Sequence, residues 1–285
     1  MKIGFIGLGV MGRPMAGHLI AAGHDVFLHR VKNASQPLVE AGGKALGTAR
    51  AVAEAAEIII LMLPDTPDVE AVLFGPDGVA EGCAPGKLVI DMSSISPGAT
   101  KAFAARIAET GASYADAPVS GGEVGAKAAS LTIMVGSSEA DFARAKPLFE
   151  LMGKNITRIG VVGDGQTAKV TNQVIVGLTI QAVAEGLALA KAAGADVAKV
   201  REALMGGFAA SRILEVHGER MIKRTFDPGF RIRLHRKDIG LAMEAAKSLE
   251  LYLPHAASLQ QLMNKALADG LGDKDHSALI SLLQD

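Results

Sequence analysis

Cysteine is nearly absent from this sequence of 285 residues, in which Cys83 is the only one. A single cysteine excludes an intrachain disulfide and is compatible with a reducing compartment. Long hydrophobic runs are also lacking, because the longest uncharged stretch, 170–184, is shorter than the ~20 residues that span a bilayer. The first residues lead directly into an expected strand, without the apolar segment and cleavage site of a secretory signal. We therefore expect a cytoplasmic protein.

An excess of charge of either sign is missing as well. The 29 basic and 30 acidic side chains leave a net charge of -1, which gives no reason to expect nucleic-acid or membrane binding. The seven histidines are scattered, with none three or four positions from another, and no Cys/His spacing matches a zinc site. No G-x-S-x-G turn is present for a nucleophilic serine. We expect neither a metal site nor covalent catalysis by serine.

The first half of the chain alternates apolar runs with amphipathic segments. Expected strands cover 2–7, 24–29, 57–63, 87–92, 112–118, 131–136 and 156–160, and expected helices cover 10–22, 97–109 and 138–151. The run EIIILML at 57–63 is apolar at almost every position, as in a strand that is buried on both faces. Alternation of this kind predicts a parallel, doubly wound α/β sheet.

The pattern changes after Val162. A GDG turn offers Asp164 as an N-cap, and nothing then breaks a helix before Gly194, which predicts a helix of about 29 residues. Helical spacing continues at 197–205, 212–223, 235–250 and 255–269, without a convincing strand. We expect a Rossmann-type domain at 1–162, and an all-α domain at 163–285 that begins with the long interdomain helix.

A glycine-rich loop lies between the first strand and the first helix. GFIGLGVMG contains Gly7, Gly9 and Gly12 in the G-x-G-x-x-G pattern, within the loop Gly7, Leu8, Gly9, Val10, Met11 and Gly12. Between a strand and a helix, this pattern indicates a dinucleotide site in which the backbone and the helix N-terminus bind a pyrophosphate. The alternative is a glycine-rich turn without a ligand.

The end of the second strand predicts the cofactor type. An NAD-specific site usually places Asp or Glu there, to accept hydrogen bonds from the adenosine ribose. This chain has His29-Arg30-Val31-Lys32, and Arg30 could pair with a 2′-phosphate. We favour NADP(H), with NAD(H) as the alternative if Arg30 is only a solvated loop charge.

Other expected strand ends should line the same crevice. Leu63 and Pro64 follow one strand, and Ser93, which follows the next, is placed to approach the ribose or the nicotinamide. Ser120, Gly121 and Gly122 are small enough for successive N–H groups to face a carboxylate. Each of these segments could instead be a plain turn.

Lys169 is the only formal charge between Gly165 and Ala184 on the long helix. A lysine in such an apolar stretch is costly to bury. Asn172 is three residues further and shares its face, with Gln173 nearby. Lys169 could form a structural ion pair, reach solvent, or donate a proton to a carbonyl oxygen, and its place where two domains meet favours the last. The second charged cluster, FRIRLHRKD at 230–238, could be a solvated basic face in which Lys237-Asp238 opens a helix.

Four motifs together resemble the β-hydroxyacid dehydrogenases, the family that includes 3-hydroxyisobutyrate dehydrogenase and tartronate semialdehyde reductase. They are GFIGLGVMGRPMA (4–16), DAPVSGGEVGA (116–126), GQTAKVTNQ (165–173) and HRKD (235–238), and they span the whole chain. The stretches 205–230 and 275–279 are most similar to the tartronate semialdehyde reductase branch. One departure is His29-Arg30-Val31, where NADP-using members often have Asn-Arg-Thr or Asn-Arg-Ser.

The resemblance implies NAD(P)H-dependent reduction of a short semialdehyde that carries a carboxylate. It implies that Lys169 is the catalytic lysine with Asn172 as its partner, and that Ser120, Gly121 and Gly122 bind the substrate carboxylate. It places Ser93 on the cofactor and Lys237 at the nicotinamide and substrate end, with Asp238 as a weaker assignment. By analogy with the family we also expect a homo-oligomer, a dimer or a tetramer. A nucleotide-binding scaffold or sensor without chemistry is the non-enzyme alternative.

Overall fold

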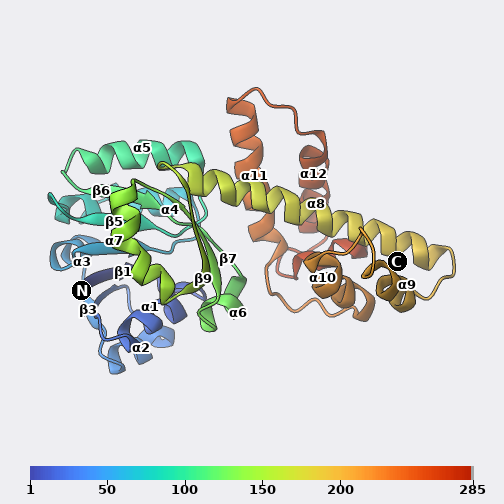
Figure 1. Cartoon of the computed structure of the whole chain (residues 1–285), viewed down its shortest axis with the longest axis horizontal. Coiled ribbons are helices and arrows are strands. Elements are labelled where there is room, and N and C mark those ends of the chain that lie inside the picture. The colour runs from blue at the N-terminus through green and yellow to red at the C-terminus, as the bar shows by residue number, and fades with distance from the viewer. Residues whose placement is uncertain (284–285) are drawn as a thin grey trace. The chain divides into compact units, whose positions relative to one another are not determined.

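The computed structural model describes residues 1–283 as two compact units, and the division falls between Lys169 and Val170, inside one long helix (Figure 1). The first unit is built on one sheet of nine strands in the order β3-β2-β1-β4-β5-β6-β8-β7, with β9 paired to β8. The strands are β1 (Lys2–Ile6), β2 (Asp25–His29), β3 (Lys44–Leu46), β4 (Ile58–Leu61), β5 (Leu88–Asp91), β6 (Ser113–Asp116), β7 (Val119–Ser120), β8 (Leu131–Gly136) and β9 (Gly153–Gly160).

The helices of the first unit cover both faces of this sheet. They are α1 (Gly12–Ala21), α2 (Gln36–Glu40), α3 (Ala49–Ala55), α4 (Thr66–Phe74), α5 (Pro97–Ala108), α6 (Gly122–Lys127) and α7 (Glu139–Glu150), with 3-10 turns at Asn33–Ser35 and Val79–Gly82. The predicted α/β fold with a Rossmann-type domain is confirmed. The short elements α2, β3, α3 and α6 and helix α4 were not predicted.

Strand β4 shows how the sequence produces the two layers. All four of its residues are buried, and alternate side chains belong to opposite hydrophobic clusters. Ile58 and Ile60 pack with residues of α1 and α7, whereas Ile59 and Leu61 pack with residues of α3, α4 and α5. Because neither face meets water, every position of the strand can be apolar.

The sheet is not parallel throughout. Strands β3, β2, β1, β4, β5 and β6 are parallel neighbours, but β8 runs antiparallel to β6 and β7, and β9 is parallel to β8. The alternation of strands and helices did not reveal this reversal, because β7 has only two residues and leads through α6 into β8. The predicted parallel, doubly wound sheet is therefore confirmed for six strands, and the sheet is mixed at this edge.

Helix α8 (Asp164–Ala192) has 29 residues, as predicted from the absence of a helix breaker. Among the helices of residues 1–283, it alone is long and apolar enough to cross a membrane. Core helices of soluble proteins meet the same criterion of length and composition. Its first turn is not capped as expected. Asp164 accepts a hydrogen bond from the N–H of Val161, which precedes the helix, while Asp116 accepts from the N–H of Gln166.

The second unit is helical, and residues 163–283 contain no strand beyond an isolated bridge between Arg231 and Asp275. After α8 come α9 (Val197–Leu204), α10 (Arg212–Lys223), α11 (Ile232–Ser248), α12 (Pro254–Ala268) and a 3-10 helix, η3 (His276–Leu282). One buried cluster joins Ile180 and Leu187 of α8 to Ile239 of α11, Leu259 of α12 and Leu279 of η3. The core of this unit is thus assembled around the second half of α8.

Candidate active site

The glycine-rich loop between β1 and α1 has the shape that a dinucleotide requires. Gly7 has φ of 104°, and a β-carbon there would collide with the carbonyl oxygen of Met62. A β-carbon at Gly12 would collide with the carbonyl oxygen of Gly7, whereas one at Gly9 would meet nothing within 4 Å. The first and third glycines therefore allow a tight turn and close helix–strand packing, while the second faces open space. No side chain caps the N-terminus of α1.

The remaining residues of this loop differ in exposure. Leu8 and Met11 pack against the hydrophobic cluster beneath α1, while Val10 is exposed. The loop is thus anchored at two apolar positions between its glycines.

Arg30 directly follows β2, whose last residue, His29, is paired with Ile6 of β1. Its backbone is left-handed, with φ of 55°, and its side chain is exposed. The next turn is held by Arg13 of α1, whose Nη1 donates to the carbonyl oxygen of Ala34 at 2.9 Å. The end of β2 therefore presents a cation beside the glycine-rich loop and no carboxylate.

Ser93 links two of the expected strand ends. Its Oγ accepts a hydrogen bond from the N–H of Leu63 at 2.9 Å, and its own N–H donates to Asp91 Oδ1 at 2.9 Å. Leu63 and Pro64 follow β4, and the Leu63 side chain lies beside Gly7. The structure thus brings Gly7, Leu63 and Ser93 together at the carboxyl ends of adjacent parallel strands.

The first turn of α8 is fixed to the sheet by two buried polar side chains that the sequence analysis did not select. Asp116 accepts from the N–H groups of Gly163 and Gln166, both at 2.7 Å. The Gln166 amide accepts from the N–H of Ile95 at 3.2 Å and donates to the carbonyl oxygen of Ser93 at 2.8 Å. Burial raises the pKa of Asp116 to about 6, although the two N–H groups act in the opposite direction.

Lys169 is one turn further along α8, and only 6% of it is exposed. Asp116 and Gln166 therefore set the position and direction of the helix turn that carries this lysine. Both side chains lie inside motifs that the sequence analysis had quoted, and a polar residue in a mostly apolar segment was the available signal.

Ser120, Gly121 and Gly122 form the turn from β7 into α6. Both glycines have positive φ, 130° and 58°. Gly121 is exposed and Ser120 is partly exposed. His18 of α1 is hydrogen-bonded through Nε2 to the carbonyl oxygen of Ala126 at 2.9 Å, which ties α6 to the helix that follows the glycine-rich loop.

In the second unit, a chain of hydrogen bonds connects the expected residues Asn172, Lys237 and Asp238. The Asn172 amide donates to Gln173 Oε1 at 2.8 Å, and Gln173 Nε2 donates to Asp238 Oδ2. Lys237 Nζ lies 3.2 Å from Asp238 Oδ1. Gln173, which is 4% exposed, is the shared partner, although the sequence analysis noted only that it was near Lys169.

The cluster at 230–238 is not a solvated basic face throughout. Arg231 and Arg233 are exposed and face Asp273, but His235 and Asp238 are buried. Helix α11 begins at Ile232, so Lys237 and Asp238 are in its second turn rather than at its start. The expected interaction of Asp238 with the helix dipole is therefore wrong, and Gln173 and Lys237 are its partners instead.

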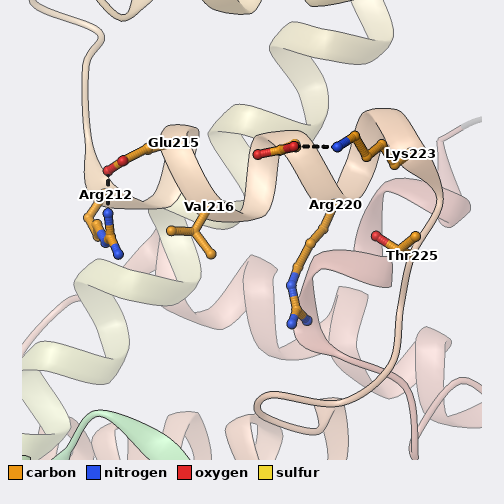
Figure 2. Close-up of a pocket in the computed structure, with 7 residues that line it drawn as sticks. Arg212, Glu215, Val216, Arg220, Lys223 and Thr225 are labelled. Atoms are coloured by element: carbon orange, nitrogen blue, oxygen red, sulfur yellow. Dashed lines mark hydrogen bonds and ion pairs between the residues drawn. The ribbon is translucent and has the colours of Figure 1, made fainter. Parts of the chain in front are cut away.

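None of the expected site residues lines the shallow surface pocket on α10, which charged side chains of that helix and Thr225 surround (Figure 2). Three of the scattered histidines do gather nearby in the fold. His217 and His276 lie close to Asp275 in an arrangement that could hold a metal ion, and His235 contacts His276.

Two family models of known proteins together match almost the full length of the chain. Residues 2–160 match the family model for the NAD binding domain of 6-phosphogluconate dehydrogenase. Residues 163–283 match the model for the NAD-binding region of NADP-dependent 3-hydroxyisobutyrate dehydrogenase.

Individual relatives also cover the full length. The chain is 57% identical to 2-hydroxy-3-oxopropionate reductase of Escherichia coli (strain K12), over 100% of this chain and 97% of the relative. It is 40% identical to 2-(hydroxymethyl)glutarate dehydrogenase of Eubacterium barkeri, over 99% and 94% of the two chains. Among solved structures, 3-hydroxyisobutyrate dehydrogenase of Mycobacterium tuberculosis with L-serine has a TM-score of 0.92 at 32% identity, and 99% of each chain is covered.

Proposed function

Because the chain belongs to the 3-hydroxyisobutyrate dehydrogenase-like family of NAD(P)-dependent β-hydroxyacid dehydrogenases, we propose that it reduces tartronate semialdehyde (2-hydroxy-3-oxopropanoate) to glycerate. It is an oxidoreductase that acts on CH–OH groups. The observation that carries the choice of substrate is the 57% identity to 2-hydroxy-3-oxopropionate reductase along the full chain.

The glycine-rich loop fits a nicotinamide dinucleotide. The open space at Gly9 and the uncapped N-terminus of α1 offer room and N–H donors for the pyrophosphate. When bound, the cofactor supplies the hydride for the aldehyde carbon. Leu63, Pro64 and Ser93 would hold its ribose and nicotinamide end, since they follow strands β4 and β5 at the same edge as the loop.

We propose NADP(H) as the preferred cofactor, with NAD(H) as a weaker alternative. Arg30 supports this preference, because an exposed guanidinium after β2 can form a bidentate pair with a 2′-phosphate. A carboxylate at this point would instead favour the free hydroxyls of NAD(H), and the chain has none between His29 and Lys32.

Lys169 in its ammonium form is the proposed proton donor to the oxygen of the reduced aldehyde. In the reverse direction, the neutral amine would remove the hydroxyl proton. Its burial supports this role, since a lysine that is 6% exposed on a helix fixed by Asp116 and Gln166 has a restricted position. General acid–base catalysis of this kind contributes about 10²–10⁴-fold to the rate.

The substrate carboxylate is assigned to the turn at Ser120, Gly121 and Gly122. Left-handed φ at both glycines turns the backbone, so that neighbouring N–H groups can face one anion. Asn172 and Lys237 would bind the substrate hydroxyl and the nicotinamide end. Gln173 and Asp238 restrict the two side chains through the hydrogen bonds described above.

A steady-state screen tests the substrate. Tartronate semialdehyde, methylmalonate semialdehyde and L-serine would be compared, each with both cofactors in the appropriate redox state. The proposal expects tartronate semialdehyde with NADPH to give the highest kcat/KM. Preference for methylmalonate semialdehyde would instead indicate a 3-hydroxyisobutyrate dehydrogenase, which is the name of another relative. Flat absorbance with every aldehyde would favour a nucleotide-binding scaffold.

We also propose a cytoplasmic homo-oligomer, a dimer or a tetramer. Large apolar side chains are exposed on α8, where Ile175 and Leu189 are 61% and 72% exposed. Phe208, between α9 and α10, is fully exposed. Light scattering across a concentration series would measure the mass, and a monomer of 29.4 kDa at every concentration would contradict the proposal.

A further inference from the structure

Three histidines from different parts of the second unit form a continuous buried chain between Asp275 and helix α8. His217 is on α10, His235 is on α11 and His276 is at the start of η3. His217 Nδ1 lies 3.4 Å from Asp275 Oδ1, and His217 Nε2 lies 3.3 Å from His276 Nε2. His276 Nδ1 lies 2.9 Å from His235 Nδ1, and His235 Nε2 lies 3.0 Å from the carbonyl oxygen of Gln173.

The Gln173 end of this chain fixes the direction of its hydrogen bonds. The carbonyl oxygen of Gln173 can only accept, so His235 Nε2 must carry a proton. A neutral His235 then has an acceptor at Nδ1, which requires a proton on His276 Nδ1. By the same reasoning His276 Nε2 accepts, and His217 Nε2 must donate.

Three hydrogen bonds link the chain, and three neutral imidazoles carry three protons, one for each bond. The Asp275 carboxylate lies at the end of the chain, with Oδ1 3.4 Å from His217 Nδ1. That Nδ1 atom has no hydrogen-bond partner within the described residues.

His217 is the chain member nearest to this carboxylate, and its side chain is 17% exposed. Burial and the neighbouring His235 hold the pKa of His276 well below its usual range. Burial alone would raise the pKa of Asp275, but the neighbouring His217 and the hydrogen bonds from Ser277 and the Phe230 N–H act against burial and hold that pKa well below its usual range.

Asp275 is held rigidly as the fixed end of the chain. Its oxygens accept from the N–H groups of Gly229, Phe230 and Ser277 and from the Ser277 hydroxyl, and Arg220 Nη1 lies 3.1 Å away. Figure 2 shows the Arg220 side chain extending from α10 on the side away from Lys223. Because Arg220 already faces this carboxylate, a divalent cation would meet repulsion here.

The other end of the chain reaches the helix through a gap left by a glycine. A β-carbon at Gly177 would lie 3.2 Å from His235 Nε2 and 2.6 Å from Leu259 Cδ2. Glycine inside a helix is destabilising relative to alanine. Because Gly177 has no side chain, the His235 imidazole can lie against α8 and contact the Gln173 carbonyl.

We propose that His235 is a positioning residue for the catalytic turn of α8, and that the hydrogen-bonded chain through His276 to His217 fixes its tautomer. His235 acts on Gln173, whose carbonyl oxygen accepts the hydrogen bond from His235 Nε2 while its side chain is hydrogen-bonded to Asn172 and Asp238. Lys169 is one helical turn before Gln173. The effect on turnover rests on the proposed function, whereas the protonation pattern does not.

Nitrogen-15 labelling of histidine in the full chain, after treatment with EDTA, tests the pattern directly. Long-range proton–nitrogen spectra at pH 7 should show His235 protonated only at Nε2, His276 only at Nδ1, and His217 with a proton on Nε2. His276 protonated at Nε2, or His217 without a proton on Nε2, would overturn the proposal. So would tight binding of added zinc that shifts the His217 and His276 signals, since it would make the cluster a metal site.

Kinetic variants then separate positioning from packing. His276→Phe fills the space but removes the donor to His235, and we expect kcat to fall about 10-fold or more with cofactor affinity unchanged. His276→Asn keeps a donor where Nδ1 was and should recover kcat to within about threefold of wild type. His255→Asn, on the exposed start of α12, is the matched control. Equal loss in the Phe and Asn variants would show a packing role and overturn the proposal.

Failure of the proposed function looks different from failure of this inference. An inactive wild-type protein with the expected histidine spectrum would leave the chain intact and reject the reaction. An active protein whose histidines have other tautomers would support the reaction and reject the histidine chain.

Discussion

The carboxylate of Asp116 at the end of strand β6 accepts the backbone N–H of Gln166 in the first turn of α8, with 2.7 Å between Asp116 Oδ2 and that nitrogen. Its second oxygen accepts from the N–H of Gly163 just before the helix. A side chain from the sheet thereby caps the helix that carries Lys169. The direction of this helix depends on a residue 53 positions earlier than the lysine in the sequence.

The pKa of Asp116 makes this cap sensitive to pH. Burial raises the pKa from 3.8 to about 6, so the protonated form is favoured by folding. The contribution of Asp116 to the free energy of unfolding is therefore complete below about pH 4 and is lost as the pH rises through about 6. A shift of about two pKa units corresponds to roughly 3 kcal/mol.

Denaturant unfolding of wild type and Asp116→Asn between pH 4 and pH 7.5 measures this effect. The wild type should lose stability with rising pH relative to the variant, which cannot ionise at this position. Parallel pH profiles would contradict the account, and a relative gain with rising pH would mean that the pKa is lowered instead.

The three loop glycines should respond differently to alanine. Gly12→Ala forces a β-carbon against the Gly7 carbonyl oxygen, and we expect a loss of about 1–3 kcal/mol in the free energy of unfolding. Gly9→Ala meets open space and should stay within about 0.5 kcal/mol of wild type. Gly9→Ala should instead weaken cofactor binding, and we expect the Kd to rise by about 10-fold or more, which equals about 1.4 kcal/mol.

Thermal denaturation and fluorescence titration with NADPH would measure both quantities for each variant. Gly23→Ala is a useful comparison, because that glycine also meets no atom within 4 Å but is left-handed, with φ of 81°, and lies after α1 away from the loop. It should lose stability without losing cofactor affinity. Unchanged NADPH affinity in Gly9→Ala would contradict the assigned phosphate site.

Arg30 should determine the choice between the two cofactors. Removing a charged hydrogen bond costs about 1.5–3 kcal/mol, so Arg30→Ala should raise the KM for NADPH by roughly 10- to 100-fold. The KM for NADH should change little, because the free ribose hydroxyl offers no charge. Lys44→Ala is a matched surface control, because Lys44 of β3 forms an exposed ion pair with Asp25 of β2. Equal effects on NADPH and NADH would reject the role of Arg30.

The sequence predicted the parts of the fold whose signals are local. Helix α8 is long, unbroken and apolar, so its full length was confirmed at 164–192. Strand β4 was recognised because every position is apolar. Short elements such as β3 and α6, with three and six residues, contain too few positions for a periodic pattern. The antiparallel direction of β8 depends on its partners, which no local pattern specifies.

The same distinction applies to the candidate site. The glycine-rich loop and Lys169 could be selected because they lie in compact motifs. His217, His235 and His276 could not be grouped, since 59 residues separate the first from the last and only the fold brings them together. Asp116 was part of a quoted motif, but its role as the cap of α8 depends on contacts between β6 and the helix.

The turnover of Lys169→Ala with tartronate semialdehyde and NADPH, measured beside the Kd for NADPH, tests whether Lys169 is the proton donor. If Lys169 donates the proton, kcat should fall by about 10²–10⁴-fold while the Kd for NADPH stays within about threefold of wild type. Lys191→Ala, near the other end of α8, controls for the loss of a lysine from the same helix. A folded Lys169→Ala protein with kcat within threefold of wild type would contradict the account.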